Sequence, residues 1–193
     1  MKTKKVLETF KGQPCFTLQD AIRLLKPSEP AYVTLMLHNL VKQEKLFRVR
    51  RGVYSAANDP QIVGFAFPPF YYGCQDALSL HGMWEQETNP VVITTRKVRS
   101  GLRSFEGSNY LVRRINRTMF FGYESMQYGE YWIPVSIIEK TFIDMVYYRQ
   151  HMSKELINEF KKQIEKPGLQ ELLKRCPPRL AKQVTKRLKI GKK

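Results

Sequence analysis

The chain has 193 residues, of which 42% are hydrophobic and 12% aromatic, values typical of a folded globular protein rather than a disordered one. Lys and Arg number 33 against 17 Asp and Glu, so the formal charge of +16 predicts a polyanionic partner, most commonly nucleic acid. A membrane partner is not expected, because no apolar run approaches the roughly 20 residues that span a bilayer.

The positive charge is unevenly distributed. Residues 1–55 carry 11 basic and 4 acidic residues, residues 56–149 carry 9 of each, and residues 150–193 carry 13 and 4. The three cysteines and three histidines are scattered, without a C-x-x-C pair or a cluster that would bind a metal. This usage fits a reducing cytoplasm, where we expect the protein to reside, and predicts neither a metal nor a cofactor.

Residues 1–57 have the pattern of three short helices followed by a β-hairpin. Thr17 is expected to cap the second helix with Asp20 three residues later, as in a capping box. The prolines of KPSEP end that helix, and Ser28 is expected to cap a third helix with Pro30 in its first turn. The third helix should bury one apolar stripe, formed by Val33, Leu37, Leu40 and Val41.

The stretch EKLFRVRRGVYSAA predicts a hairpin that turns at Gly52, a residue suited to tight turns. Its three arginines, Arg48, Arg50 and Arg51, repel one another and gain the folded chain little. One interpretation is an edge strand protected by charge, and the other is a wing that contacts phosphate. The preceding helices favour a winged helix-turn-helix, in which the third helix enters the major groove and the wing contacts flanking phosphates.

The face of the third helix opposite the apolar stripe is mostly polar. Its residues are Tyr32, Thr34, Leu35, His38, Asn39 and Lys42. Such side chains contact base edges in the major groove, although the same pattern occurs on an ordinary solvent face. Leu35 apart, we predict that these residues bind DNA together with the three arginines of the hairpin.

A proline-containing linker is expected over residues 58–70, followed by a small mixed α/β domain over residues 71–151. We predict a helix from Gln75 to about His81 that closes at Gly82. PVVITT and NYLVRRI should be strands, and TMFFGYESMQ and EYWIPV a strand hairpin. A helix follows in SIIEKTFIDMVYYRQ, where Ser136 is the expected cap. The fold class is therefore α+β.

One segment of this central domain is strongly basic. Between Arg96 and Arg117 there are seven basic residues, and Glu106 alone opposes them. From this segment we predict DNA contacts by Arg96, Lys97, Arg99, Arg103, Arg113 and Arg114.

A winged helix followed by ALSLHG, VVITT, FFGYE and IPVSIIEKTFIDMVYY resembles the AbiEi-like antitoxin family of transcriptional regulators over roughly residues 5–150. The resemblance implies a winged helix that binds double-stranded operator DNA and represses its own operon. It also implies an adjoining domain that takes part in neutralising a nucleotidyltransferase-type toxin. The positions that match the family motifs, which we expect to be mainly structural, are Leu80, His81, Gly82, Glu139, Lys140, Thr141 and Asp144.

Residues 152–193 are expected to form a tail of two or three short basic helices, separated at a Pro-Gly and a Pro-Pro pair. Lys182, Lys186, Arg187 and Lys189 spread around the last helix. A charge run of this kind is usually a solvated face. The size of the excess favours a second phosphate contact through the first three of these residues.

The alternative function is an enzyme of the glycosylase or lyase type that flips a damaged base out of duplex DNA. Lys140 and Asp144 would then be catalytic, although the sequence lacks H-E-x-x-H, Walker and G-x-G-x-x-G motifs. The aromatic residues available for stacking would be Tyr71, Tyr72, Trp84, Tyr123, Tyr128 and Trp132. The more ordinary interpretation places these aromatics in the core, makes Lys140 and Asp144 a surface salt bridge, and leaves no catalytic residue.

Overall fold

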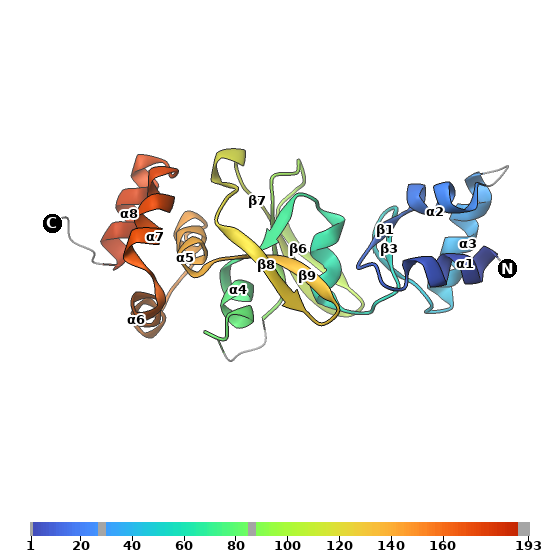
Figure 1. The fold of residues 1–193 in the computed structure, drawn as a ribbon, viewed down its shortest axis with the longest axis horizontal. Helices are drawn as coiled ribbons and strands as arrows, with labels where there is room; N and C mark the ends of the chain where they lie inside the picture. The colour runs from blue at the N-terminus through green and yellow to red at the C-terminus, as the bar shows by residue number, and fades with distance from the viewer. Residues whose placement is uncertain (1, 27–29, 85–87, 189–193) are drawn as a thin grey trace.

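The computed structural model describes residues 2–26, 30–84 and 88–188, which form an elongated molecule in three parts (Figure 1). Three N-terminal helices lie at one end, a six-stranded sheet lies in the middle, and three C-terminal helices lie at the other end. The mixture of helices with two separate sheets is that of an α+β fold, as the sequence predicts. Within the described ranges, no helix is both long and apolar enough to cross a membrane.

The N-terminal part contains three helices and a small antiparallel sheet of strand order β1-β3-β2. Its elements are α1 (Lys2–Phe10), β1 (Phe16–Thr17), α2 (Leu18–Leu25), α3 (Pro30–Lys42), β2 (Phe47–Arg50) and β3 (Val53–Ser55). The predicted capping box is confirmed, because the Thr17 hydroxyl accepts from the Asp20 amide and the Asp20 carboxylate accepts from the Thr17 amide. The expected cap at Ser28 lies outside the described residues.

The apolar stripe predicted for α3 is buried against α1, α2 and the small sheet. Val33, Leu37 and Leu40 are each at most 2% exposed, and Val41 packs at the edge of the same core. Phe10 of α1 stacks on Phe16 of β1 with 4.0 Å between ring centroids. The helical period of apolar residues therefore sets which face of α3 points outward.

The middle part is a mixed sheet of strand order β6-β7-β5-β4-β9-β8. Its strands are β4 (Phe70–Tyr72), β5 (Val91–Thr94), β6 (Gly101–Phe105), β7 (Ser108–Arg114), β8 (Tyr123–Tyr128) and β9 (Tyr131–Ser136). The β5–β7 and β4–β9 pairs are parallel, and the other pairs are antiparallel. The expected strand in TMFFGYESMQ starts only at Tyr123, because residues 117–119 form the short 3-10 helix η2 (Arg117–Met119).

The two faces of this sheet bury different elements. Tyr71, Val91 and Ile93 pack with α4 (Cys74–Leu80) and α5 (Ile138–Tyr147), whereas their neighbours Phe70, Tyr72 and Val92 face the other core. This alternation follows from the period of two residues along a strand. α5 starts after Ile137 and not at a Ser136 cap, because the Ser136 hydroxyl is hydrogen-bonded to the Thr141 hydroxyl instead.

The segment that we expected to be a linker, residues 58–70, is instead a buried part of the fold. Residues 60–66 form the 3-10 helix η1 (Pro60–Ala66), with the Asp59 carboxylate as its cap. Ile62 and Val63 share a core with Val49 and Val53 of the β2–β3 hairpin. The three prolines suggested an open chain. The apolar residues between them are instead buried, because removing their surface from water stabilises the folded state.

The C-terminal residues form short helices, as expected, but these helices pack into the fold and are not a free tail. α6 (Lys154–Gln163), α7 (Lys166–Lys174) and α8 (Pro178–Leu188) pack against α5 at the far end of the molecule (Figure 1). Phe160 contacts Phe142 of α5 edge-on, with 4.9 Å between the ring centroids. Leu180, Val184 and Leu188 belong to the same core as α4 and α5. These helices are therefore an integral layer of the fold, with their basic residues on its outer side.

Candidate nucleic-acid interface

The outward face of α3 is the first part of the candidate interface. All six residues predicted to lie opposite the apolar stripe are exposed, including Tyr32 at 45% and Leu35 at 60%. Lys2 of α1 adds a cation here, because its Nζ lies 5.1 Å from the centroid of the Tyr32 ring. Two large, exposed hydrophobic side chains beside Thr34, His38 and Asn39 are more typical of a contact surface than of a solvated face.

The three predicted arginines of the β2–β3 hairpin differ in burial. Gly52 forms the turn with φ of +74°, which a residue without Cβ adopts easily. Arg48 of β2 and Arg51 of the turn are exposed. Arg50 is half-buried, and its guanidinium carbon lies 5.5 Å from the centroid of Phe67. The register of the β2–β3 pair shifts between Arg48 and Arg50, so these two side chains do not follow the regular alternation of a strand.

Arg50 belongs to a cluster of positive charge at the junction between the hairpin and the large sheet. Arg103 of β6 lies on the same Phe67 ring at 5.1 Å, and Arg96 follows β5 nearby. Burial lowers the pKa of Arg50, and the charges of Arg96 and Arg103 lower it further. The buried Nε of Arg50 has no hydrogen-bond partner among the described residues. We call Arg50, Arg96 and Arg103 the junction arginines.

In the part of the chain that the structure describes, no carboxylate balances the junction arginines. None of the ion pairs between described residues includes any of the three. Arg103 donates from Nη2 to the carbonyl oxygen of Arg99 at 2.8 Å, a neutral acceptor that leaves the charge uncompensated. Crowded guanidinium groups without a carboxylate partner are a candidate site for an anion such as a phosphate, which could reach the exposed Arg96 but not the buried Nε of Arg50.

The remaining predicted DNA-binding residues lie elsewhere. Arg114 is exposed at the carboxyl end of β7 and Lys97 is exposed in the loop after β5, whereas Arg113 is half-buried over the Tyr148 ring at 4.7 Å. Lys182, Lys186 and Arg187 are exposed on α8, at the end of the molecule away from α3 (Figure 1). The small sheet lies between the three N-terminal helices and the large sheet, whereas the cations of α8 lie at the opposite end of the molecule (Figure 1).

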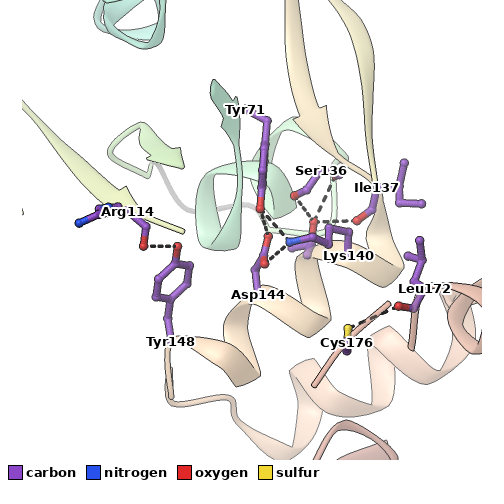
Figure 2. Close-up of polar contacts among 10 residues, drawn as sticks. Tyr71, Arg114, Ser136, Ile137, Lys140, Asp144, Tyr148, Leu172 and Cys176 are labelled. Atoms are coloured by element: carbon purple, nitrogen blue, oxygen red, sulfur yellow. Dashed lines mark hydrogen bonds and ion pairs between the residues drawn. The ribbon is translucent and has the colours of Figure 1, made fainter. Parts of the chain in front are cut away.

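Lys140 and Asp144 form the predicted i,i+4 pair, but the pair is in the core and not on the surface. Both side chains are 0% exposed. Figure 2 shows them converging with Tyr71, whose hydroxyl accepts from Lys140 Nζ at 2.8 Å and donates to Asp144 Oδ2 at 2.8 Å. Lys140 also donates directly to Asp144. Burial lowers the pKa of Lys140 and raises that of Asp144, and their mutual attraction opposes both shifts.

This burial leaves the enzyme hypothesis without support, because a catalytic group must reach its substrate. The aromatic residues proposed for base stacking are also dispersed. Tyr71 and Tyr72 are buried, whereas Trp132 is 64% exposed on β9 and Tyr123 stacks on Tyr71 at 5.2 Å. Among residues that the structure describes, no three His, Cys, Asp or Glu side chains form a group able to hold a metal.

The other motif residues carried by the family resemblance also make structural contacts. A ring nitrogen of His81 is 2.8 Å from the carbonyl oxygen of Ser136, and the Glu139 carboxylate accepts from the Glu165 amide at 2.8 Å. Sequence reasoning missed Asp76 of α4, which is 3% exposed and accepts from the Val91 amide at 3.0 Å. Burial raises the pKa of Asp76 to about 7. The sequence gives no indication that Asp76 is buried, because a single aspartate in a helix is usually exposed.

Comparisons with known proteins find a family match for the N-terminal part. Residues 4–57 match the model of a family described as "Transcriptional regulator, AbiEi antitoxin", which confirms for this segment the resemblance seen in the sequence. The fold also resembles the crystal structure of the RV2827C protein from Mycobacterium tuberculosis, with a TM-score of 0.62 and 12% sequence identity. That likeness covers 97% of this chain and 76% of that chain, and at this identity it concerns the fold alone. A comparison with curated proteins found no match.

Proposed function

We propose that the protein is a DNA-binding transcriptional regulator in which residues 1–57 act as a winged helix-turn-helix domain. The observation that carries this proposal is the exposed face of α3, together with the exposed Arg48 and Arg51, within the segment that matches a family of regulators. α3 would lie in the major groove, where Asn39 and His38 offer hydrogen bonds to base edges. Such a regulator would act in the cytoplasm.

The hairpin and the junction arginines would provide the phosphate contacts. Arg48 and Arg51 extend from the hairpin, and the junction arginines continue the positive surface onto the large sheet. Contacts of this kind fix the position of the protein on the duplex without specifying the sequence. Base recognition would therefore rest on α3 alone.

The antitoxin role rests on the family match and the resemblance. A protein of this kind would repress its own operon and counteract a toxin, which the resemblance suggests is of the nucleotidyltransferase type. A neighbouring reading frame that arrests growth when expressed alone, and is tolerated when this protein is co-expressed, would support that role. Growth arrest that this protein does not relieve would contradict it.

Gel-shift titrations of the full chain test the DNA-binding role. The probes are the duplex upstream of the protein's own reading frame and a shuffled duplex of equal length. We expect Asn39→Ala and His38→Ala each to reduce the preference for the natural duplex by about 1–3 kcal/mol, the range for one specific interaction with a base. Thr9→Ala, an exposed substitution on α1, is the matched control and should change neither affinity. Equal losses on both duplexes would remove α3 as the base-reading helix.

A further inference from the structure

An open hollow of about 650 Å³ lies at the edge of the large sheet, beside the segment that carries the junction residue Arg96. β5 and β7 run parallel, with Thr94 opposite Arg114, so the loops that follow both strands meet at one edge. In open α/β sheets, ligands bind outside the carboxyl ends of the strands. β7 has seven residues, so this edge is ~20 Å from the end of β7 that faces the hairpin, at about 3.3 Å per residue.

The hollow is lined by three cations and no anion. Lys97, Arg114 and Arg117 are all exposed, and none belongs to an ion pair among the described residues. Three positive charges around one concavity repel one another unless an anion lies between them. The arrangement therefore favours a ligand with several negative oxygens.

The rest of the lining suits the other parts of a nucleotide. Tyr147 supplies a half-buried aromatic wall, and Thr95 and Asn116 supply polar groups. The side-chain oxygen of Asn116 already accepts from the amide and hydroxyl of Thr118, which leaves its NH₂ group free to donate to a ligand. The volume is within the 300–1,000 Å³ typical of small-molecule sites.

The backbone around the hollow is fixed before any ligand arrives. The Arg114 carbonyl oxygen accepts from the Tyr148 hydroxyl at 3.2 Å (Figure 2), and the Arg114 amide donates to Ser100 Oγ at 3.0 Å. The Ile115 amide donates to the Thr94 carbonyl oxygen at 2.9 Å. Because main-chain groups make these contacts, Arg114 can be replaced without disturbing them.

We propose that this hollow binds a nucleoside 5′-phosphate, with Lys97, Arg114 and Arg117 on the phosphates and Tyr147 against the base or ribose. The same chemistry is present in a free nucleotide and along a DNA strand, so the test must separate the two sources. This inference does not depend on the proposed reading of DNA by α3.

Isothermal titration of the full chain with ATP, inorganic triphosphate and adenosine tests the proposal directly. We expect ATP to bind more tightly than triphosphate, and adenosine not to bind. Arg114→Ala/Arg117→Ala should weaken ATP binding at least about tenfold, because two charge-assisted hydrogen bonds are removed. Lys166→Ala/Arg179→Ala, which removes two exposed cations of the C-terminal helices, is the charge-matched control and should bind ATP as the wild type does.

A second set of titrations uses a short duplex and no nucleotide. If the hollow takes free nucleotide, Arg114→Ala/Arg117→Ala should bind the duplex within about twofold of the wild-type affinity. Loss of duplex affinity without any ATP binding would show that the hollow contacts the DNA backbone and would overturn the nucleotide site. ATP binding that the double variant leaves unchanged would equally overturn it. Thermal unfolding of each variant verifies that the fold is retained.

Discussion

The core triad of Lys140, Asp144 and Tyr71 and the junction arginines show two ways of placing charge in one chain. In the triad, each polar group contacts a partner of opposite or complementary character, and no side-chain surface remains for solvent. At the junction, like charges share one aromatic ring and a buried donor is unused. Charge that is neutralised internally supports the fold, whereas charge left uncompensated near the surface indicates an external anion.

The strongest test of this contrast removes the cation of the triad. Lys140→Met leaves Asp144 buried without its partner, and we expect the free energy of unfolding to fall by about 3–5 kcal/mol. Lys140→Met/Asp144→Leu should recover much of that loss, because no buried charge remains. Urea unfolding measures both. Lys162→Ala, which breaks an exposed pair with Glu159, is the control and should cost at most about 1 kcal/mol.

Asp76 extends the comparison to a buried carboxylate that is hydrogen-bonded but has no cationic partner among the described residues. Its folded pKa of about 7 exceeds the ordinary value of 3.8, so the folded state binds its proton more tightly than the unfolded state. The free energy of unfolding should therefore fall as pH rises from about 4 to 7, by at most about 1.4 kcal/mol per pH unit. Above about pH 7 this contribution should be constant.

Urea unfolding at pH 5 and pH 7.5 isolates the Asp76 contribution. Asp76→Asn should remove most of the difference between the two pH values, because the amide does not titrate. Glu130→Gln, at an exposed position between β8 and β9, should retain the wild-type difference. If Asp76→Asn kept the full pH dependence of the free energy of unfolding, that dependence would not come from Asp76.

Exposed arginines without an acidic partner should behave differently from the core triad. We expect Arg48→Ala/Arg51→Ala to weaken DNA binding and to leave the free energy of unfolding unchanged. Removing two phosphate contacts should reduce the slope of log K against log salt by about two and weaken duplex binding about tenfold at moderate salt. Fluorescence anisotropy over a range of salt concentrations measures the slope. Lys166→Ala/Arg179→Ala removes the same charge at the other end of the molecule and should leave the slope unchanged. An unaltered slope in the Arg48→Ala/Arg51→Ala variant would show that the hairpin does not contact phosphates.

The smallest expected effect concerns Arg50. Arg50→Met keeps an unbranched side chain over Phe67 while removing one crowded charge and the unpaired Nε. We expect the protein without DNA to be unchanged or up to about 1 kcal/mol more stable, and its duplex affinity to fall. Arg48→Met, at the exposed position, should lower affinity without any gain in stability. A clearly less stable Arg50→Met would mean that stacking on Phe67 outweighs the repulsion.

The features predicted correctly from the sequence are those that short-range patterns determine. The Thr17–Asp20 capping box and both faces of α3 follow from spacings of three and four residues, and the β8–β9 turn follows from local composition. The contacts that the sequence does not reveal join distant segments. Tyr71 precedes Asp144 by 73 residues, and nothing near either residue indicates the other.

The same limit explains the two segments whose packing differs from expectation. Prolines and positive charge are local signals of exposed chain, and they suggested a linker at residues 58–70 and a tail at residues 152–193. The apolar residues Ile62, Phe160 and Val184 decide the outcome instead, because their burial depends on surfaces that other parts of the chain provide. Deleting residues 152–193 would therefore uncover the core of α5 rather than trim a free extension.

The docking of the β2–β3 hairpin on η1 has a consequence for the choice of DNA. β3 pairs with β1 on one side, and Val49 and Val53 are held in the core of the large sheet on the other. A hairpin restrained from both sides is a rigid element that cannot adapt to the width of a groove. If the protein binds DNA as proposed, the duplex would have to conform to this hairpin, and steps that are costly to bend or compress would bind less well even where no side chain touches a base.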